Sequence, residues 1–233
     1  MRIIGLNGSP RRLHSRTGQL VQQVLVGAAA EGAGTEMLEI TRLHIEPCVA
    51  CDRCHLVGTC AQKDCAQKDD FQQTFDAIIA ADGLVLGSPV YIYQVTAQLK
   101  NWIDRLGNPI HCQRFLGKYG AVVTTAGGAG EKETAAYMED VLLRTGMQCV
   151  GRLACLIETD DMLAQDSPLL VEARALGREL AQAIRERREY PEQRQAHARF
   201  RDYFRGIITR RAAKWRWEYE YWQQQGWLGP KQQ

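Results

Sequence analysis

The sequence has 233 residues, of which 45% are hydrophobic, and its formal net charge is +2. A chain of this size can bury one sizeable core without disulfides or a structural metal, so we expect one main domain. The near balance of charge gives no reason to expect nucleic acid or a membrane surface as a partner, and no apolar run approaches the ~20 residues that cross a bilayer.

Apolar runs alternate with amphipathic stripes from residue 2 to residue 188. Strands are expected at residues 2–7, 36–40, 83–87, 121–125 and 153–159, and helices at residues 20–28, 71–79, 99–106, 131–145 and 168–188. Five strands that alternate with helices predict a parallel sheet covered on both faces. Ligands of such sheets bind outside the carboxyl ends of the strands, so the loops after the first, third and fourth strands are the expected site.

The loop after the first strand carries Ser9, Arg11, Ser15 and Thr17 ahead of a helix N-terminus. Hydroxyl groups, a guanidinium and N-terminal N–H groups together suit a phosphate dianion. Because neither the G-x-G-x-x-G fingerprint nor the Gly-Lys-Ser/Thr ending of a P-loop is present, a mononucleotide such as FMN fits better than a dinucleotide. An ordinary capped loop between a strand and a helix is the alternative.

Five of the eight cysteines lie between positions 48 and 65, which favours a metal or redox site in a reducing compartment, here the cytoplasm. Cys48, Cys51 and Cys54 are separated by two residues each, and Cys60 follows after five more. A compact run of this kind can wrap one [4Fe-4S] cube, whereas zinc usually draws on two separated Cys-x2-Cys pairs. Zinc or metal-free thiols stay open as alternatives. Cys65 could replace Cys60 as the fourth ligand, although the spacing favours Cys60.

The loop after the third strand, with Pro89, Val90, Tyr91 and Ile92, is a rigid turn with apolar and aromatic tips. The Leu-Lys segment at residues 99–100 and the Ile-Asp-Arg segment at residues 103–105 follow this turn. Together with the Gly-Ser-Pro-Arg loop at residues 8–11, these segments resemble the NAD(P)H-dependent FMN reductase group of flavodoxin-like proteins. The cysteine run makes the chain similar to the iron-sulfur flavoproteins of that group. The resemblance covers residues 1–188 and implies an α/β fold: a doubly wound, five-stranded parallel sheet of strand order 2-1-3-4-5.

The resemblance also implies two cofactors, FMN and a [4Fe-4S] cluster, and the residues that hold them. The FMN phosphate would lie at Ser9, Arg11, Ser15 and Thr17, and the isoalloxazine ring would lie against Pro89, Val90, Tyr91 and Ile92. The loop of Thr125, Ala126, Gly127 and Gly128 would approach the flat ring, since glycine causes no steric conflict there. The cluster ligands would be Cys48, Cys51, Cys54 and Cys60. Arg16 departs from the asparagine expected at its position.

The composition changes near residue 190, so we expect a flavodoxin-like domain at residues 1–188, with its cysteine loop at 47–66, and an extension at 189–233. Apolar side chains recur there at helical spacing and predict one amphipathic helix: Phe200, Tyr203, Phe204, Ile207, Ile208, Trp215, Tyr219 and Trp222. A second subunit is the expected cover for this face, in a homodimer or homotetramer. Interleaved basic and aromatic residues also suit nucleic acid, but Glu218, Glu220 and the overall charge balance speak against it. A membrane-surface helix is a similarly weak alternative.

The resemblance implies an FMN-dependent electron-transfer oxidoreductase. NAD(P)H or a ferredoxin would donate electrons, FMN and the cluster would carry them, and a small molecule or a protein would accept them. We assign no side chain as a catalytic acid or base. A plain NAD(P)H-dependent FMN or quinone reductase without a cluster, and a non-enzymatic flavin and thiol redox sensor, are the alternatives.

Overall fold

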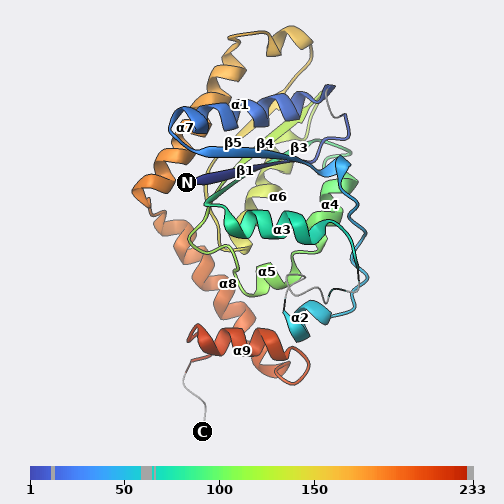
Figure 1. The fold of residues 1–233 in the computed structure, drawn as a ribbon, viewed down its shortest axis with the longest axis vertical. Helices are drawn as coiled ribbons and strands as arrows, with labels where there is room; N and C mark the ends of the chain where they lie inside the picture. Colours follow the sequence, from blue (N-terminus) through green and yellow to red (C-terminus); the bar gives the residue numbers. More distant parts are fainter. Residues whose placement is uncertain (12–13, 59–64, 66, 230–233) are drawn as a thin grey trace.

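The computed structural model describes residues 1–11, 14–58, 65 and 67–229. Within them, five parallel strands form one sheet in the order β2-β1-β3-β4-β5 (Figure 1). The strands are β1 (Arg2–Asn7), β2 (Gly34–Glu39), β3 (Gly83–Pro89), β4 (Tyr119–Ala126) and β5 (Gln148–Leu156). The predicted sheet and its strand order are confirmed. β5 begins earlier than predicted because Gly146, with φ +96°, ends the preceding helix and lets the chain reverse at once.

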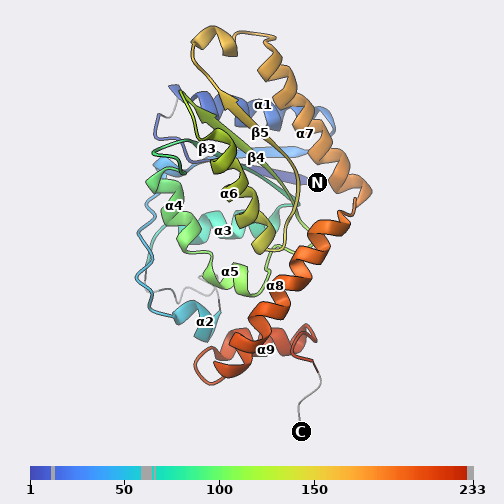
Figure 2. The same cartoon turned by 180° about the vertical axis from the view of Figure 1, so that it is seen from behind.

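Helices cover both faces of the sheet (Figures 1 and 2). α1 (Arg16–Ala30) and α7 (Pro168–Glu186) pack on one face, and α3 (Phe71–Ala80), α4 (Ala97–Asp104) and α6 (Glu131–Arg144) pack on the other. Strands β1, β3 and β4 are therefore buried on both sides. Such strands appear in the sequence as continuous apolar runs without alternation, which is why they could be recognised.

All five strands point the same way, so their carboxyl ends share one edge of the sheet. At that edge Gly8 N–H donates to the Gly87 carbonyl oxygen over 2.8 Å, and Val90 N–H donates to the Thr125 carbonyl oxygen over 2.8 Å. Thr96, the N-cap of α4, donates from its hydroxyl to the Gly8 carbonyl oxygen over 2.7 Å. These bonds fix the three predicted ligand loops against one another.

Helices α1 and α7 cross with their backbones in contact. A Cβ atom placed on Gly27 would lie 2.0 Å from the Arg174 carbonyl oxygen, and one on Gly177 would lie 1.8 Å from the Val24 carbonyl oxygen. Both distances are far shorter than any van der Waals contact, so only glycine fits at the crossing. The crossing fixes the axis of α1, whose N-terminus begins at the ligand loops.

The C-terminal extension consists of α8 (Pro191–Arg210) and α9 (Arg216–Gln224), so the prediction of one helix is wrong. The chain turns at residues 211–215, and this turn brings Trp215 and Trp222 into one apolar cluster with Ile208 and Cys112. Figure 1 shows α9 beneath α5 (Gly107–His111) and α2 (Arg53–Val57) of the same chain. The buried part of the aromatic face is thus covered within the chain, and it provides no separate argument for a second subunit.

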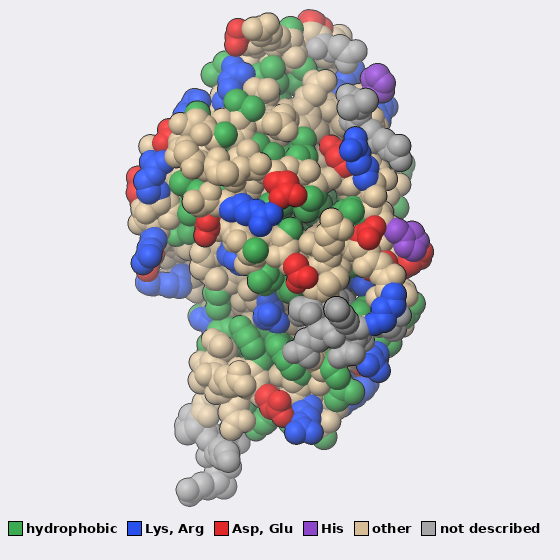
Figure 3. Space-filling view, viewed as in Figure 1, with side chains coloured by type: hydrophobic (Ala, Val, Ile, Leu, Met, Phe, Trp, Pro, Cys, Tyr) green, Lys and Arg blue, Asp and Glu red, His purple; other side chains and the backbone are tan. Residues whose placement is uncertain are grey.

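Charged side chains of both signs are interspersed over the face of the described chain shown in Figure 3. Among the helices that the structure describes, none combines the length and the apolar character needed to cross a membrane.

We expect Gly177→Ala to lower the free energy of unfolding by about 3 kcal/mol or more, because the new methyl group would overlap the α1 backbone. Gly206→Ala is the matched control. Its Cβ would meet only the tip of the flexible Arg210 side chain, at 3.2 Å, and higher helix propensity should stabilise the protein by up to ~1 kcal/mol. Chemical denaturation of both variants measures the difference, and equal stabilities would contradict the close crossing.

Candidate functional site

The ends of β1, β3 and β4 surround a cavity of about 140 Å³. It is lined by Ser9, Arg11, Arg16, Thr17, Pro89, Val90, Tyr91, Thr125, Ala126, Gly127 and Ile157. Of the residues predicted to bind FMN, Ser15, Ile92 and Gly128 are not among the lining residues. The structure therefore brings together the three predicted loops, and it adds Arg16 and Ile157, which the sequence analysis did not include.

Positive charge gathers at one end of this cavity. Arg11 and Arg16 both line it, and Arg16 and Thr17 are the first two residues of α1, whose N-terminus carries a partial positive charge. The Arg16 guanidinium also donates to the Ile157 carbonyl oxygen over 2.8 Å, which holds the side chain at the cavity wall. Two cationic side chains and a helix N-terminus have the charge that suits a phosphate group.

Hydrogen bonds within the first loop fix its shape. Ser15 is the N-cap of α1, and its Oγ accepts the Gly18 N–H over 2.8 Å. Ser9 Oγ accepts the Arg11 N–H over 3.3 Å, and Thr17 Oγ1 lies 2.7 Å from Thr125 Oγ1. Ser15 thus shapes the loop through its cap, whereas Ser9 and Thr17 present hydroxyl groups to the cavity itself.

The second loop contains a strained turn. Tyr91 and Gln94 pair through two backbone hydrogen bonds, and the two residues between them have positive φ angles, +48° for Ile92 and +60° for Tyr93. Both angles match a type I′ turn, which normally uses glycine or asparagine, and a β-branched residue such as isoleucine is an outlier there. Strain of about 1–3 kcal/mol per residue is typical of ligand-binding segments. The turn leaves Ile92 94% exposed and Tyr93 68% exposed at the rim of the cavity.

The third loop packs closely against this turn at one point and is open at another. Gly130 has φ +92°, and a Cβ atom there would lie 3.0 Å from Tyr93 Cδ1. At Gly127 and Gly128 an added Cβ would meet nothing within 4 Å among the described atoms. Open backbone at these two glycines leaves room for a flat ring to approach the loop.

Of the predicted metal ligands, Cys48 and Cys51 lie in an irregular segment after β2, and Cys54 lies in α2. Cys48 and Cys51 are exposed, Cys54 is half-buried, and Cys60 lies outside the described residues. Ala50 and Asp52, which flank Cys51, have φ angles of +51° and +58°. Left-handed residues in such turns orient backbone N–H groups toward bound anions, including iron-sulfur clusters.

The arrangement of the described cysteines bears on the choice between zinc and a cluster. Among the residues that the structure describes, no cysteine belongs to a group of three metal-type side chains whose donor atoms lie within 4.8 Å of one another. A tetrahedral zinc ion holds its sulfur ligands about 3.8 Å apart, because its bonds to sulfur are about 2.3 Å long. A cube distributes its thiolates over separate iron atoms and needs no such close approach.

Cys65 lies beside a buried ion pair. Asp69 and Arg105, with side chains only 2% and 3% exposed, are joined by a salt bridge, and Arg105 also donates to Cys65 Sγ over 3.3 Å. Burial raises the pKa of Asp69, but hydrogen bonds from Arg105 and from the backbone N–H groups of Glu46 and Phe71 outweigh it, so the pKa lies below its ordinary value of 3.8. This pair anchors the two ends of the cysteine loop to the sheet domain.

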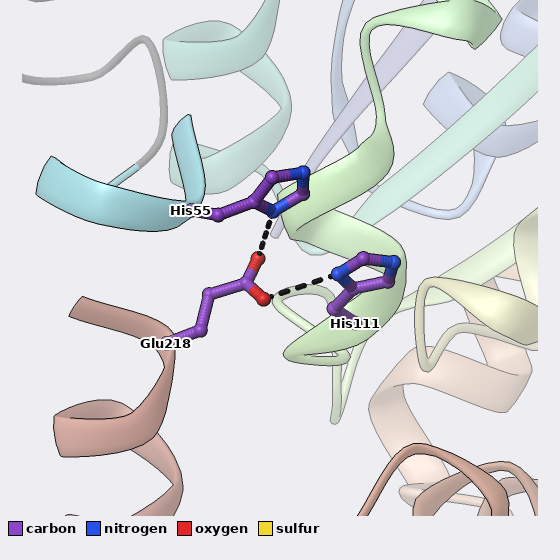
Figure 4. Close-up of side chains that lie close together, drawn as sticks. All are labelled: His55, His111 and Glu218. Carbon is purple, nitrogen blue, oxygen red and sulfur yellow. Dashed lines mark hydrogen bonds and ion pairs between the residues drawn. The ribbon is translucent and has the colours of Figure 1, made fainter. Parts of the chain in front are cut away.

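A second buried carboxylate lies on the other side of the loop (Figure 4). Glu218 of α9 is 0% exposed and accepts hydrogen bonds from His55 Nδ1 of α2 over 2.7 Å and from His111 Nδ1 of α5 over 3.1 Å. Burial raises the pKa of Glu218, but the hydrogen bonds from His111 and His55 prevail and leave the pKa below its ordinary value. Trp215 stacks on both imidazole rings, with centroid distances of 4.4 and 5.1 Å.

The sequence analysis did not identify this group. It assigns no role to His55, and it mentions Glu218 only as an acidic residue of the C-terminal extension. The sequence does contain one indication of a buried carboxylate. Glu218 lies three residues after Trp215 and four before Trp222, on the helix face that the apolar stripe predicts to be buried. A carboxylate on such a face needs partners, although the sequence does not say which.

A sequence model of the NADPH-dependent FMN reductase family matches residues 1–161. The chain belongs to the NADPH-dependent FMN reductase family. An iron-sulfur flavoprotein of Archaeoglobus fulgidus is 33% identical over 153 residues, which cover 65% of this chain and 66% of that protein. An iron-sulfur flavoprotein of Methanocaldococcus jannaschii is 32% identical over 154 residues, which cover 65% of this chain and 76% of the relative.

The fold of this FMN reductase family member is also similar to that of a solved flavodoxin from the domain Archaea. The two share 17% identity with a TM-score of 0.51, over 79% of this chain and 99% of the flavodoxin. The predicted resemblance to the FMN reductase and iron-sulfur flavoprotein group, the flavodoxin-like fold and the class of an NAD(P)H-dependent flavin oxidoreductase are confirmed. The match to the family model ends at residue 161, before α7, so it does not test the C-terminal extension.

We expect Asp69→Asn to lower the free energy of unfolding by about 3–5 kcal/mol at pH 7, because Arg105 would lose its buried counter-charge. The folded-state pKa of Asp69 is lowered, so its contribution is present above pH ~4 and is lost as the pH falls through the folded pKa. Denaturant titrations of variant and wild type should therefore converge below pH ~4. Asp104→Asn, which breaks the exposed Lys100–Asp104 pair, should cost less than ~1 kcal/mol at either pH.

Proposed function

We propose that this chain binds FMN at the ends of β1, β3 and β4 and a [4Fe-4S] cluster at its cysteine loop, and that it passes electrons between NAD(P)H or a ferredoxin and an acceptor. The observation that carries the proposal is the cavity of about 140 Å³ in which two arginines, a helix N-terminus and hydroxyl groups meet at the sheet edge. The similarity to iron-sulfur flavoproteins supports the cluster.

The cavity suits one end of FMN. Its volume is below the ~300–1,000 Å³ typical of a pocket that encloses a whole ligand, so it fits the phosphate and the adjoining part of the cofactor. Ser9, Arg11 and Thr17 would hold the phosphate. The ring would lie on the open rim, against Tyr91 and the uncrowded backbone of Gly127.

The cysteine loop suits a cluster by its donor set and its backbone. Cys48, Cys51 and Cys54 would be three thiolate ligands, and the left-handed residues Ala50 and Asp52 would turn N–H groups toward the sulfur atoms. The fourth ligand would be Cys60, as the spacing favours, or Cys65. The contact between Cys65 Sγ and Arg105 gives Cys65 a partner within the sheet domain, which supports the assignment of Cys60.

FMN, when bound, accepts a hydride from NAD(P)H and can release its two electrons singly, and an iron-sulfur cluster carries single electrons. The residues of this chain have positioning tasks. Arg11 and Arg16 compensate the phosphate charge, and Pro89, Val90 and Tyr91 form an apolar wall at the cavity. The exposed Ile92 and Tyr93 leave the ring open to a nicotinamide or an acceptor. The donor, the acceptor and a homodimeric or homotetrameric assembly in the cytoplasm are part of this proposal.

A single preparation tests both cofactors. Protein purified without oxygen should show flavin absorption bands and a broad shoulder near ~400 nm, with about four iron and four sulfide per chain, as a [4Fe-4S] site requires. Flavin without iron would favour a plain FMN or quinone reductase. Zinc in place of iron would contradict the cluster, and absence of flavin would remove the centre of the proposal.

The same metal analysis identifies the fourth ligand. We expect Cys60→Ser to abolish cluster iron and Cys65→Ser to retain it, because only Cys60 follows the other three cysteines at the spacing of a compact cluster run. The reverse result would assign Cys65, and iron retained in both variants would show that the ligand set is wrong.

Arg11→Ala should weaken FMN binding by about 1.5–3 kcal/mol, the usual strength of a charge-assisted contact to phosphate. Fluorescence titration of the flavin-free protein with FMN and with riboflavin measures it. The loss should appear for FMN and be absent for riboflavin, which has no phosphate. An FMN affinity equal to that of the wild type would contradict the assignment of Arg11.

A further inference from the structure

Helix α9 contacts the cysteine loop on both sides of Cys54. Lys214, just before the helix, forms a salt bridge with Asp52, two residues before Cys54. Glu218 accepts the hydrogen bond from His55, the residue directly after Cys54. Further along the loop, a Cβ atom on Gly58 would lie 2.9 Å from Trp217 Nε1, so the backbone there lies directly against the indole ring.

Glu218 is the centre of these contacts. Its carboxylate accepts the N–H groups of His55 and His111, and Asn108 Nδ2 donates to the same carboxylate over 3.0 Å. Asn108 Nδ2 also lies within 3.3 Å of the Cys54 carbonyl oxygen, to which it donates. Figure 4 shows that the two imidazoles and the carboxylate come from three separate helices and point toward one another. One buried carboxylate thus connects α9, α5 and the backbone of Cys54.

Helix α2 does not fix the loop at this point by itself. α2 has only five residues, none of them buried, and a helix of one turn and a half is not stable on its own. Asp52, the residue before α2, has a left-handed backbone and makes no side-chain capping hydrogen bond to the helix. The contacts from α5 and from the C-terminal extension therefore help to determine where Cys54 lies.

We propose that Lys214, Trp217 and Glu218 form a clamp that positions Cys54 for metal binding, with Glu218 as the central positioning residue. The clamp gives the extension a role toward the cysteine site within its own chain. The part of the proposal that concerns cluster iron rests on the proposed function, whereas the clamp itself concerns the loop and can be measured without metal.

The alternative is a divalent ion bound by His55, His111 and Glu218, since donor atoms of these three side chains lie within 4.8 Å of one another. The hydrogen bonds favour the clamp. Each imidazole Nδ1 faces a carboxylate oxygen at hydrogen-bond distance, which requires the proton that a metal would displace. Asn108, which donates from its amide group, completes the set of partners around the carboxylate.

The clamp is tested first on the metal-free full chain. Under native conditions with limiting iodoacetamide, peptide mass spectrometry gives the alkylation rate of Cys54 relative to that of the exposed Cys48. We expect Glu218→Gln to raise this ratio at least about tenfold, since a lost charge-assisted hydrogen bond shifts local opening by that order. Arg216→Ala is the control. Arg216 lies on the same helix in an exposed pair with Glu220, so the ratio should stay at the wild-type value.

Lys214→Ala covers the case in which Glu218→Gln fails to fold. It removes only an exposed ion pair, so the protein should keep its fold and its flavin, and the Cys54 ratio should rise about two- to threefold. If the alkylation rate of Cys54 relative to that of Cys48 is unchanged in both Glu218→Gln and Lys214→Ala, the clamp is overturned.

Metal analysis of the same variants separates the two proposals. In protein prepared without oxygen, Glu218→Gln should lose iron or shift the reduction potential and the electron paramagnetic resonance spectrum of the cluster, while flavin per chain stays at the wild-type level. Wild-type protein without iron, but with the predicted alkylation pattern, would support the clamp and overturn only the cluster. One divalent ion per chain that persists after alkylation of the loop cysteines and is lost in Glu218→Gln would overturn the clamp in favour of a metal site.

Discussion

The parallel sheet determines where everything else can lie. Its strands all end at one edge, and the backbone contact of Gly8 with Gly87 and that of Val90 with Thr125 hold the loops of three strands together there. Because β1, β3 and β4 are buried on both faces, polar and strained residues are confined to their ends. The arginines and the hydroxyl groups of the cavity lie in the segments that follow these strand ends or in the first turn of α1, and the type I′ turn with Ile92 lies in the loop after β3.

Two buried carboxylates determine the position of the cysteine loop. Asp69 binds Arg105 at the end of the loop and accepts the Glu46 N–H at its start, so one side chain closes the loop. Glu218 fixes the middle of the cysteine loop from α9, which lies more than 140 residues further along the chain. Buried charges are costly unless paired, and a lost partner leaves the other group without compensation. Two of the points that fix the described part of the loop are therefore buried carboxylates, while Cys48 and Cys51 between these points stay exposed.

The sequence predicts those features that depend on local patterns. The alternation of strands and helices follows from apolar periodicity, whereas the strand order is implied by a family resemblance that short motifs carry. Nine of the lining residues of the cavity were predicted from these motifs and from the chemistry of the first loop. Ile92 shows the limit, because a sequence does not reveal that the turn takes positive φ angles and directs this side chain to solvent. The C-terminal extension shows the same limit of prediction from sequence. The spacing of Trp215, Glu218 and Trp222 marks a buried face, but its partners are His55 and His111, more than 100 residues away, and no local pattern relates them.

These anchors also separate folding from cofactor binding. Small zinc domains fold only with their metal because ligand bonds replace a core. Here the apolar clusters on both faces of the sheet, the Asp69–Arg105 pair and the Glu218 group are complete without a metal ligand, and the described cysteines of the loop are exposed or half-buried. The cavity at the strand ends, which we propose for FMN, shares no lining residue with the cysteine loop or with α9. Loss of metal should therefore leave the sheet domain folded and able to bind flavin, so the two sites can be studied independently in one protein.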